Sequence, residues 1–533
     1  MSDRLRMSGL VSGMDTEAIV GALVSAASYK TTKLKNTQTK LGWKQETWKS
    51  LNSEVYSLYS GKLDNLRYTG NYNAKKSTLD SDVATVTADN NAVLGSQTLE
   101  VHQMATSGYL TGAQVKIGDT NTLADKSTTL ASLGISGIDS DESSVDIKIK
   151  FGTGESAKIQ TVTLKGSMTM EQVAKAFEEK GVSANYDASN GRFFIASKSS
   201  GADANFEIER EGSSAAALDA LGLGYTYSDD GGKRTYNYTS SGAVKIQGQN
   251  AKIKLNEVEF ESSSNTFAVN GLNITVKGLS EKLTDGDAPT YKKSSIVTSV
   301  DVDTVYDSIK DFFKSYNELI KKMDTYYNAD AAKGYDVLSD DEKEAMSDEE
   351  VEKWETKIKD SLLRKDSNLN SLINLFKNGL SKSYEVNGTK YSLASFGIAT
   401  LGYFEAKENE HGMYHIDGDP DDDSSKSKDD ALKKMIASDP EAVSGFFTQL
   451  FKGVYTELNT SMRFIEGTRS AMKVYDDKLL QKEYDNLTSE ITAQEKKVQD
   501  MEDHYYDKFT AMEKALSKLN TQSGSFASML GNG

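Results

Sequence analysis

Two long apolar seams, one near each end of the chain, restrict the possible folds of this sequence more than any other feature. In the first, apolar residues recur every seven residues and then in steps of three and four, at Leu34, Leu41, Trp48, Leu51, Val55 and Leu58. In the second, which begins at Leu480, the same alternation runs on with one additional step of four, through Leu487, Ile491, Val498, Met501, Tyr505, Phe509, Met512, Leu516 and Leu519. This spacing is typical of long helices that pack along a shared seam.

Neither seam is expected to form a stable helix alone, because helices draw most of their stability from packing an apolar face. The two seams therefore predict each other as partners in a coiled coil, although two separate surface helices on a globular core are the alternative. Thr37 and Lys44 weaken the first half of the N-terminal seam. We expect the Phe509–Leu519 face to pack on the 34–58 helix and then on groups outside the chain.

The N-terminal stretch "AIVGALVSAA" (18–27), preceded by Arg4 and Arg6, resembles the apolar core of a short signal peptide. Asp15 and Glu17 argue against that interpretation, since they suit the cap and the positive end of a helix. Ile19 and Leu23 have helical spacing. We therefore expect a retained amphipathic helix here, with both apolar residues in the assembly interface.

The middle of the chain, from Lys75 to about Thr290, has a different pattern. Turn residues are dense, and alternating segments such as "VDIKIKF", "RFFIASK" and "NITVKG" predict strands. Thr169 and Gln172 form a capping box that predicts one helix. The dipeptide Asn190-Gly191 predicts a hairpin turn.

Helical spacing returns at Val302 and runs to Met323. Two successive capping boxes, at Ser339 and Ser347, predict two further helices, and others fit 369–380 and 443–465 around a hairpin over 399–417. The predicted fold class is α+β multidomain, with terminal helices forming a coiled-coil leg, a helical bundle stalk, and β-rich head domains inserted between them. The predicted boundaries are 1–41 with 470–533 for the leg, 42–73 with 292–469 for the bundle, 74–115 with 243–291 for the inner head, and 116–242 for the outer head.

Composition narrows the classes of function. The chain has 533 residues, which predicts about three or four domains, and a net charge of −17. Nucleic acid and anionic membranes would repel such a chain, and no apolar run is long enough for a transmembrane helix. The chain has no cysteine, so disulfides, thiolate metal sites and cysteine nucleophiles are excluded.

Candidate chemistry is sparse. His411 and His415 have the spacing of zinc ligands, but Gly412 stands where the zinc-protease pattern requires glutamate, which favours a surface histidine pair. The acidic segment 417–423 lacks the glycine and glutamate that an EF-hand needs, which favours a solvated loop, with weak calcium binding as the alternative. We predict no catalytic residue, cofactor or metal site, and therefore no enzyme.

Several segments, taken in order, resemble one family. They are "GLVSGMDTEAIVGAL" (9–23), "VATVTADNNAVLGSQTLEVHQMAT" (83–106), "SYNELI" (315–320), "LRKDSNL" (363–369), "FGI" (396–398), "DPEAVSGFF" (439–447) and "YYDKFTAMEKALSKLNTQSG" (505–524). The chain is similar in these to the bacterial flagellar filament cap proteins, also called flagellar hook-associated protein 2. It departs from the family pattern at Ala27 and Lys30, where Glu and Pro are usual, and at Leu94, where Pro is common.

The resemblance implies a structural protein that forms a homo-oligomeric ring at the filament tip and helps exported flagellin to fold and insert. It also implies export through the flagellar apparatus without a cleaved signal peptide, and contacts with hook–filament junction proteins and an export chaperone. An alternative function is a flagellar surface adhesin that binds host glycans or mucin through the outer head. A metalloprotease or glycan hydrolase in the outer head is a more distant alternative.

Overall fold

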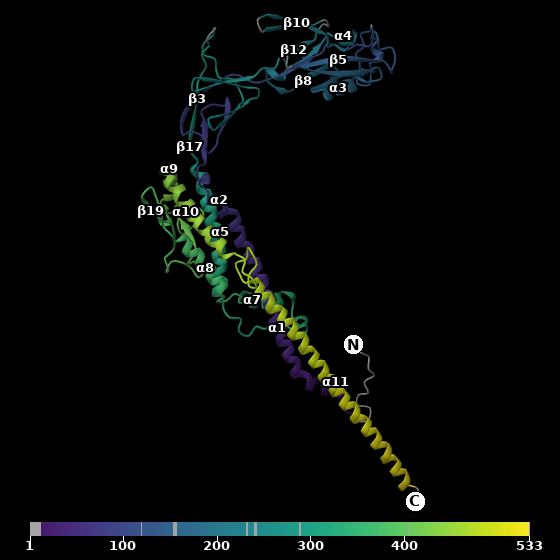
Figure 1. The fold of residues 1–533 in the computed structure, drawn as a ribbon, viewed down its shortest axis with the longest axis vertical. Helices are drawn as coiled ribbons and strands as arrows, with labels where there is room; N and C mark the ends of the chain where they lie inside the picture. The colour runs from purple at the N-terminus through teal and green to yellow at the C-terminus, as the bar shows by residue number, and fades with distance from the viewer. Residues whose placement is uncertain are drawn as a thin grey trace. The chain divides into compact units, whose positions relative to one another are not determined.

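The computed structural model describes residues 12–118, 120–152, 157–230, 233–238, 242–286, 289–402 and 404–531. Arg4 and Arg6 of the N-terminal prediction lie outside these residues. The chain folds into two compact units, residues 1–73 with 302–533 and residues 74–301. The predicted α+β multidomain class is confirmed, because a long N-terminal helix packs against a long C-terminal helix and the β-rich segment is inserted between them (Figure 1). Among the described residues, no helix is long and apolar enough to cross a membrane.

The first unit is mainly helical. Its elements are α1 (Thr16–Ser57), the π-helical turn η1 (Leu58–Leu63), α2 (Asp64–Leu66), η2 (Thr69–Tyr72), α5 (Val302–Asn328), α6 (Asp340–Glu344), α7 (Asp348–Asp360), α8 (Ser367–Leu380), β18 (Tyr384–Val386), β19 (Thr389–Tyr391), η6 (Leu393–Phe396), β20 (Ile398–Thr400), β21 (Tyr414–Ile416), α9 (Ala431–Ser438), α10 (Pro440–Ser461) and α11 (Asp477–Leu530). Asp15 caps α1 as predicted, since its carboxylate accepts a hydrogen bond of 3.0 Å from the Ala18 amide. The N-terminal helical segments form one continuous helix from Thr16 rather than two.

The core of the helical unit is aromatic. The apolar positions of α5 that share one helical face, from Val305 to Met323, are buried. Phe312 of α5 meets Phe451 of α10 edge-on, with ring centroids 4.5 Å apart. The capping boxes at Ser339 and Ser347 are confirmed. So is the hairpin predicted over 399–417, in which β20 pairs with β21.

The second unit is a β-rich insertion. Its strands are β1 (Lys75–Leu79), β2 (Ala84–Ala88), β3 (Gly95–Gln103), β4 (Ser107–Thr111), β5 (Ser144–Phe151), β6 (Lys158–Lys165), β7 (Val182–Asp187), β8 (Arg192–Ser200), β9 (Phe206–Glu209), β10 (Tyr225–Asp230), β11 (Lys233–Tyr238), β12 (Val244–Ile246), β13 (Ala251–Leu255), β14 (Val258–Ser262), β15 (Thr266–Val269), β16 (Leu272–Val276) and β17 (Ser294–Val300). It also holds α3 (Met170–Glu179), α4 (Ala215–Ala220), η3 (Ala131–Leu133) and η5 (Ala202–Ala204). The capping box of α3 and the β7–β8 hairpin around Asn190-Gly191 are confirmed.

Two separate hydrophobic cores stabilise this insertion. One lies between the five-stranded sheet β1-β17-β3-β13-β14 and the three-stranded sheet β15-β16-β2, with Leu99 and Ile274 fully buried. The other lies around the sheets β12-β4-β8-β7 and β6-β5-β9, with Phe177 and Phe193 fully buried. Leu110 belongs to the second core. The predicted division into an inner and an outer head, with its boundaries, stays a prediction.

Lys245 of β12 is an unusual residue in the second of these regions. The side chain is buried, with 8% of the residue exposed, and its Nζ lies 3.2 Å from the centroid of the Phe206 ring. Within the described ranges of the chain, the Nζ has no hydrogen-bond partner. Burial lowers the pKa of Lys245 from 10.5 to about 7, because a charged amine is poorly solvated there.

We predict that this amine makes the stability of the β12 region depend on pH between about 7 and 10.5. The folded chain loses the proton near 7 and the unfolded chain only near 10.5, so the free energy of unfolding rises with pH across that window and is flat below it. Lys245→Met should remove the slope and stabilise the region by roughly 2–4 kcal/mol at pH 7. Hydrogen exchange of β12 and β4 at several pH values would measure both effects.

The matched control is Lys175→Met on α3, since Lys175 is exposed in the same region. It should leave the pH profile unchanged. An unchanged slope in Lys245→Met would contradict the assignment to this amine.

Candidate assembly interface on the terminal helices

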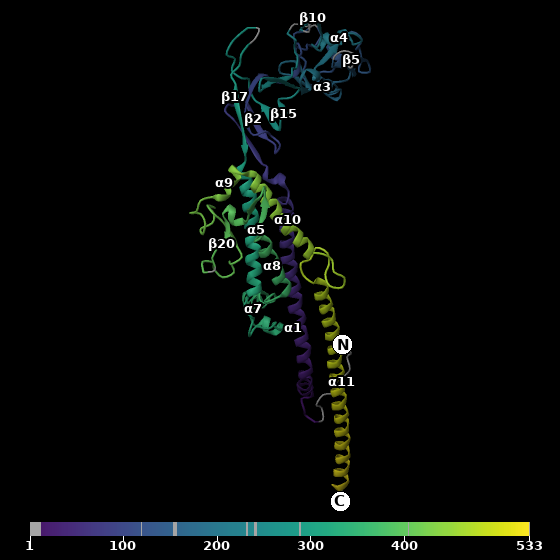
Figure 2. The same cartoon turned by 60° about the vertical axis from the view of Figure 1, so that its left-hand side comes forward.

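The N-terminal helix α1 and the C-terminal helix α11 run antiparallel and lie side by side (Figures 1 and 2). The Lys35 ammonium and the Glu495 carboxylate are 2.7 Å apart. Three residues further along α1, the Gln38 amide donates a hydrogen bond of 2.6 Å to the Thr488 hydroxyl. As the residue number rises on α1 it falls on α11, which sets the register of the pair.

This register corrects one prediction. The 34–58 segment lies against the first third of α11 and the loop before it, as the stacking of Trp48 on Tyr475 at 5.1 Å shows. It does not lie against the Phe509–Leu519 face. The amide of Ser12, the first described residue, donates a hydrogen bond of 3.3 Å to Glu513. Beyond Glu513, no turn of α1 lies opposite α11 within the described part of the chain.

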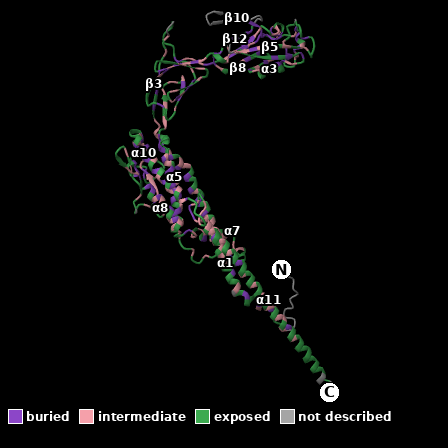
Figure 3. Cartoon of the chain, in the orientation of Figure 1, coloured by how far each residue is buried: buried purple, intermediate pink, exposed green. Residues whose placement is uncertain are grey.

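The residues predicted for the assembly interface differ in exposure, and the burial colours of Figure 3 follow the trend along α11. Leu41, Trp48, Leu51, Val55, Leu58 and Ile491 are buried. Ile19, Leu34, Leu487, Val498, Tyr505, Phe509, Met512 and Leu516 are half-buried. Leu23, Met501 and Leu519 are exposed, at 45%, 38% and 60%. The buried members are covered by this chain, whereas contacts of the others with further chains stay a prediction.

The C-terminal part of the first seam belongs to the helical bundle rather than to the α1–α11 pair. The turn η1 packs against α5 and α10. The Tyr59 ring stacks on Tyr455 of α10 at 4.4 Å, and Lys322 of α5 pairs with Glu54 of α1 at 2.5 Å. Leu51, Val55 and Leu58 therefore anchor α1 in the bundle.

The buried face of α1 before Leu34 was not recognised in the sequence. Val20, Val24 and Thr31 are buried, at 1%, 5% and 8% exposure, whereas their neighbours Ile19 and Leu23 are not. The three buried residues are separated by steps of four and seven. Val20, Val24 and Thr31 are smaller or less apolar than Ile19 and Leu23, so the sequence pattern pointed to Ile19 and Leu23 as the apolar face.

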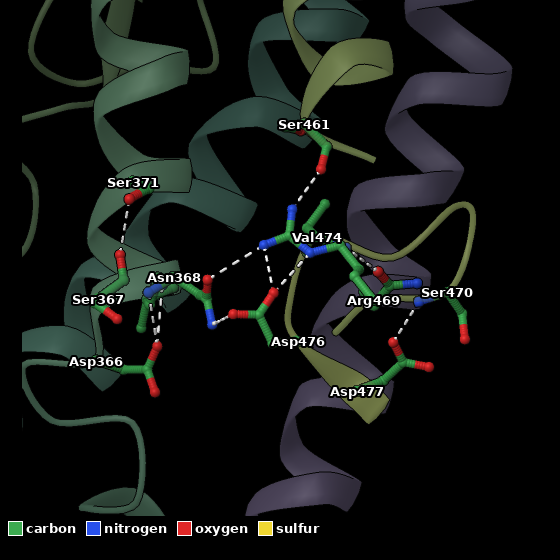
Figure 4. A network of polar contacts seen from close by, with 12 residues as sticks. Asp366, Ser367, Asn368, Ser371, Ser461, Arg469, Ser470, Val474, Asp476 and Asp477 are labelled. Atoms are coloured by element: carbon green, nitrogen blue, oxygen red, sulfur yellow. Dashed lines mark hydrogen bonds and ion pairs between the residues drawn. The ribbon is translucent and has the colours of Figure 1, made fainter. Parts of the chain in front are cut away.

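A polar clamp holds the start of α11, and Arg469 is at its centre (Figure 4). Its guanidinium donates two hydrogen bonds, of 2.9 and 2.7 Å, to Oδ1 of Asp476, the residue that precedes α11. It also donates to the Ser461 carbonyl at the end of α10, at 2.6 Å, and to the Asn368 side chain of α8, at 3.4 Å. One half-buried cation thus joins the ends of three helices.

The same loop is tied to α1 by Asn52, which is 5% exposed. The Asn52 amide accepts a hydrogen bond of 2.9 Å from the Val474 amide and donates one of 3.3 Å to the Met472 carbonyl. Burial alone would raise the pKa of Asp477, but hydrogen bonds from Ser470 hold the pKa below its ordinary value. These contacts give α11 a defined starting point beside α1.

The two weak candidates for metal chemistry have structural partners. His415 Nδ1 lies 2.6 Å from the Asp422 carboxylate. In the acidic loop, the Lys310 ammonium contacts Asp419 at 2.5 Å and Asp421 at 2.7 Å. Among the described residues, no group of three histidine, cysteine or carboxylate side chains is arranged to hold a metal ion. The cation that Asp419 and Asp421 contact is therefore the ammonium of Lys310.

The arrangement defines a class of protein by its fold: an α+β multidomain protein whose long N-terminal and C-terminal helices pack against each other and whose β-rich segment is inserted between them. The family model described as flagellar hook-associated protein 2 C-terminus matches residues 248–521, and the one described as its N-terminus matches residues 12–108. The chain belongs to the flagellar hook-associated protein 2 family, the family of the filament cap. This is a structural family and not one of enzymes.

Individual relatives agree with this membership. The chain is 22% identical to the flagellar hook-associated protein 2 of Halalkalibacterium halodurans, over 86% of this chain and 81% of the relative. It is 24% identical to the A-type flagellar hook-associated protein 2 of Pseudomonas aeruginosa, over 99% and 98%. The crystal structure of the D1-D2-D3 domains of the flagellar cap protein FliD from Escherichia coli covers 83% of this chain and 99% of its own, with a TM-score of 0.53 and 17% identity. That likeness shows the fold.

We predict that Arg469→Met loosens the first turns of α11 without unfolding the bundle. The substitution removes the two hydrogen bonds that the guanidinium donates to Oδ1 of Asp476 and should cost about 1–3 kcal/mol of local stability. Hydrogen exchange of peptides over 470–480 should become faster, while peptides over α5 keep their protection.

Arg469→Lys is the informative comparison, because lysine keeps the charge but cannot reproduce the planar set of guanidinium hydrogen bonds. It should give an intermediate effect. Equal protection in all three proteins would show that the clamp does not hold α11.

Proposed function

We propose that this protein is the structural cap at the distal tip of the bacterial flagellar filament, where a ring of identical copies promotes the folding and insertion of exported flagellin and prevents its loss. The observation that carries this proposal is the apolar face of α11, which continues past the last described turn of α1. Family membership supports a site in the flagellum, and the uncovered face supports a role that requires other chains.

The uncovered face has the spacing of a coiled-coil seam. Apolar residues recur in steps of four and three from Tyr505 through Phe509 and Met512, which are half-buried opposite the start of α1, to Leu516 and Leu519 beyond it, and Phe526 follows seven residues later. Leu519 and Phe526 are 60% and 68% exposed. Large contiguous apolar surfaces of this kind are rare on soluble monomers and usually mark interaction sites. The sustained alternation favours another helix as the partner.

The proposed division of labour follows the predicted domains. The leg, residues 1–41 with 470–533, faces the filament and contacts neighbouring copies and flagellin through α11 and through Ile19 and Leu23. The bundle, residues 42–73 with 292–469, holds the leg in place through the Arg469 clamp. The two heads, residues 74–115 with 243–291 and residues 116–242, face away from the filament.

A second candidate function is adhesion to host glycans or mucin through the outer head region. Across β12, β4 and β8, strand pairing places Val244, Thr111 and Phe194 side by side in one row. Ile246, Tyr109 and Ala196 form the next row on the same face of the sheet. Tyr109 and Phe194 are 50% and 41% exposed, and Val244 and Ile246 are 50% and 57% exposed. Exposed aromatic rings without a charged neighbour in these rows suit the apolar face of a neutral sugar.

We predict that a protein lacking residues Phe509–Gly533 fails to cap filaments while its β-rich unit stays folded. The deletion removes the uncovered seam and little of the α1–α11 pair. In a cap-deficient strain, the truncated protein should leave flagellin in the culture medium, whereas the full chain should restore filaments. The control is Glu490→Ala with Lys497→Ala, two exposed changes where α11 runs beside α1. Filament assembly by the truncated protein would refute the proposal.

For the adhesion candidate, Tyr109→Ala with Phe194→Ala should reduce mucin or glycan-array binding by about tenfold or more, since aromatic contacts dominate such sites. Ile159→Ala on β6 is the matched control, because Ile159 is 52% exposed on a different sheet of the same core. Binding that is absent from the unmodified protein, or equal in both variants, would argue against this function.

A further inference from the structure

The loop that joins α10 to α11 exposes a group of apolar side chains. Together with the first turn of α11, it leaves four of them uncovered: Phe464, Ile465, Met472 and Leu479, at 58%, 46%, 46% and 46% exposure. Backbone hydrogen bonds draw these residues together, since the Met472 amide donates to the Met462 carbonyl at 2.9 Å and the Lys478 amide donates to the Thr468 carbonyl at 3.1 Å. We call these four residues the loop patch.

The loop patch is held in place by its own contacts. Met472 has a φ of 62°, a conformation that residues other than glycine rarely adopt, and its carbonyl accepts a hydrogen bond of 3.3 Å from the Asn52 amide. The Lys478 ammonium lies 4.4 Å from the centroid of the Phe464 ring. A surface that is already ordered loses less conformational entropy when a partner binds. The loop patch is therefore suited to docking, and the backbone strain at Met472 is of a kind that clusters at binding sites.

Basic residues surround the loop patch. Arg463 and Lys482 are exposed, and Lys473 and Lys478 are half-buried. Residues 463–482 carry five basic and three acidic side chains, a net charge of +2 in a chain whose total is −17. Complementary charge around an apolar contact selects the partner and opposes the wrong ones. The expected partner is therefore an acidic surface.

The chain itself carries an acidic surface, on α6 and the first turns of α7. Residues 340–352 include eight carboxylates and one lysine, a net charge of −7. Two of the carboxylates, Glu342 and Glu350, cap these helices, whereas Glu344 and Glu352 are exposed. We call residues 340–352 the acidic surface.

The loop patch and the acidic surface lie on opposite faces of α1 at a similar level. On the side of the acidic surface, the Lys359 ammonium of α7 lies 4.8 Å from the centroid of the Trp43 ring. On the side of the loop, the Val474 amide donates a hydrogen bond of 2.9 Å to Asn52. Positions 43 and 52 are about two and a half turns apart, which places them on opposite faces of α1 and about 14 Å apart along it. Figure 2 likewise shows the loop and α7 on different sides of α1. In one copy α1 separates the two surfaces, so they can meet only between copies.

We propose that the loop patch of one copy docks on the acidic surface of the next copy. Because the two surfaces lie at a similar level on opposite faces of α1, copies that stand side by side with parallel legs can make this contact repeatedly. The contact is heterologous, since each copy uses two different surfaces, and a heterologous contact that closes makes a ring. The inference rests on the proposed function in that it assigns a surface through which copies of the cap meet.

Charge reversal on each surface of the full chain tests the contact. Arg463→Glu with Lys482→Glu makes the surroundings of the loop patch acidic, and Glu344→Lys with Glu352→Lys makes the acidic surface less acidic and partly basic. Each double variant should weaken self-association, measured by sedimentation equilibrium, by about tenfold or more, because the charges that attracted now oppose the contact. All four side chains are exposed, so circular dichroism should show folded proteins.

Combining the reversals separates a direct contact from a general effect of charge. A chain with all four changes should associate again, because the opposite charges are restored in exchanged positions. An equal mixture of the two double variants should also associate, although neither does so alone. The control is Lys390→Glu with Lys452→Glu, which changes the net charge as much as the loop variant does, at exposed sites on β19 and α10. It should leave self-association unchanged.

Three outcomes would overturn the proposal. Self-association that is absent from the unmodified chain, or equal in the unmodified chain and both double variants, would show that these surfaces do not join copies. Failure of both the fourfold variant and the mixture to associate would show that the two surfaces do not face each other. An equal loss in the control would reduce the effect to net charge.

The same variants in a cap-deficient strain distinguish this contact from the proposed function. We expect filaments with the unmodified chain and the fourfold variant, and flagellin in the medium with either double variant alone. If the unmodified chain failed to restore filaments while the exchanged charges still restored association, the cap function would fail and the contact would stand. If the double variants associated normally but did not cap, the contact between copies would be rejected, and flagellin would be the partner of these surfaces.

Discussion

The antiparallel packing of α1 against α11 is the interaction on which the rest of this structure depends. The two helices come from segments more than 400 residues apart, as the pairs Lys35–Glu495 and Gln38–Thr488 show. Neither helix has an apolar face that is stable in water by itself. By pairing, they bury Val20, Val24 and Ile491, and they bring the two ends of the chain together. The β-rich unit is an insertion in the helical unit: the chain leaves the helical unit after residue 73 and returns to it at residue 302.

Contacts with the helical bundle fix where α11 starts and how it is oriented beside α1. Arg469 joins the start of α11 to α8 and α10, and Asn52 joins the preceding loop to α1. Two guanidinium hydrogen bonds to one carboxylate oxygen are more directional than a single ammonium contact, because the planar guanidinium permits few geometries. The clamp therefore holds the start of α11, a helix of 54 residues, in a fixed orientation relative to the bundle. Such a helix then projects its far turns away from the body that anchors it.

The apolar residues that the chain leaves exposed on α11 indicate where it contacts other molecules. The bundle buries aromatic side chains such as Phe312 and Phe446, yet the chain leaves Leu519 and Phe526 exposed on α11. A soluble chain that keeps such residues outside its own core has a surface that another molecule covers, or else a liability to aggregation. Membership of the filament cap family makes an assembly the natural setting for this surface.

The amino-acid sequence by itself determined the features that depend on neighbours within about four residues. The helix caps at Asp15, Thr169 and Ser347, the strand alternation of "VDIKIKF" and the seam spacing of α11 are all of this kind, and the structure confirms them. It also identified the family through short motifs in a conserved order along one chain.

Only the tertiary structure decided which distant segments meet. The sequence predicted the Phe509–Leu519 face as the partner of residues 34–58, but the register places Trp48 against Tyr475. The sequence likewise did not show that Val20 and Val24, rather than Ile19 and Leu23, form the buried face of α1. It also gave no sign of the Arg469 clamp. The physical reason is that a periodic seam is compatible with several registers of similar local energy. The choice among them depends on the sum of contacts between segments far apart in the chain, which no local pattern records.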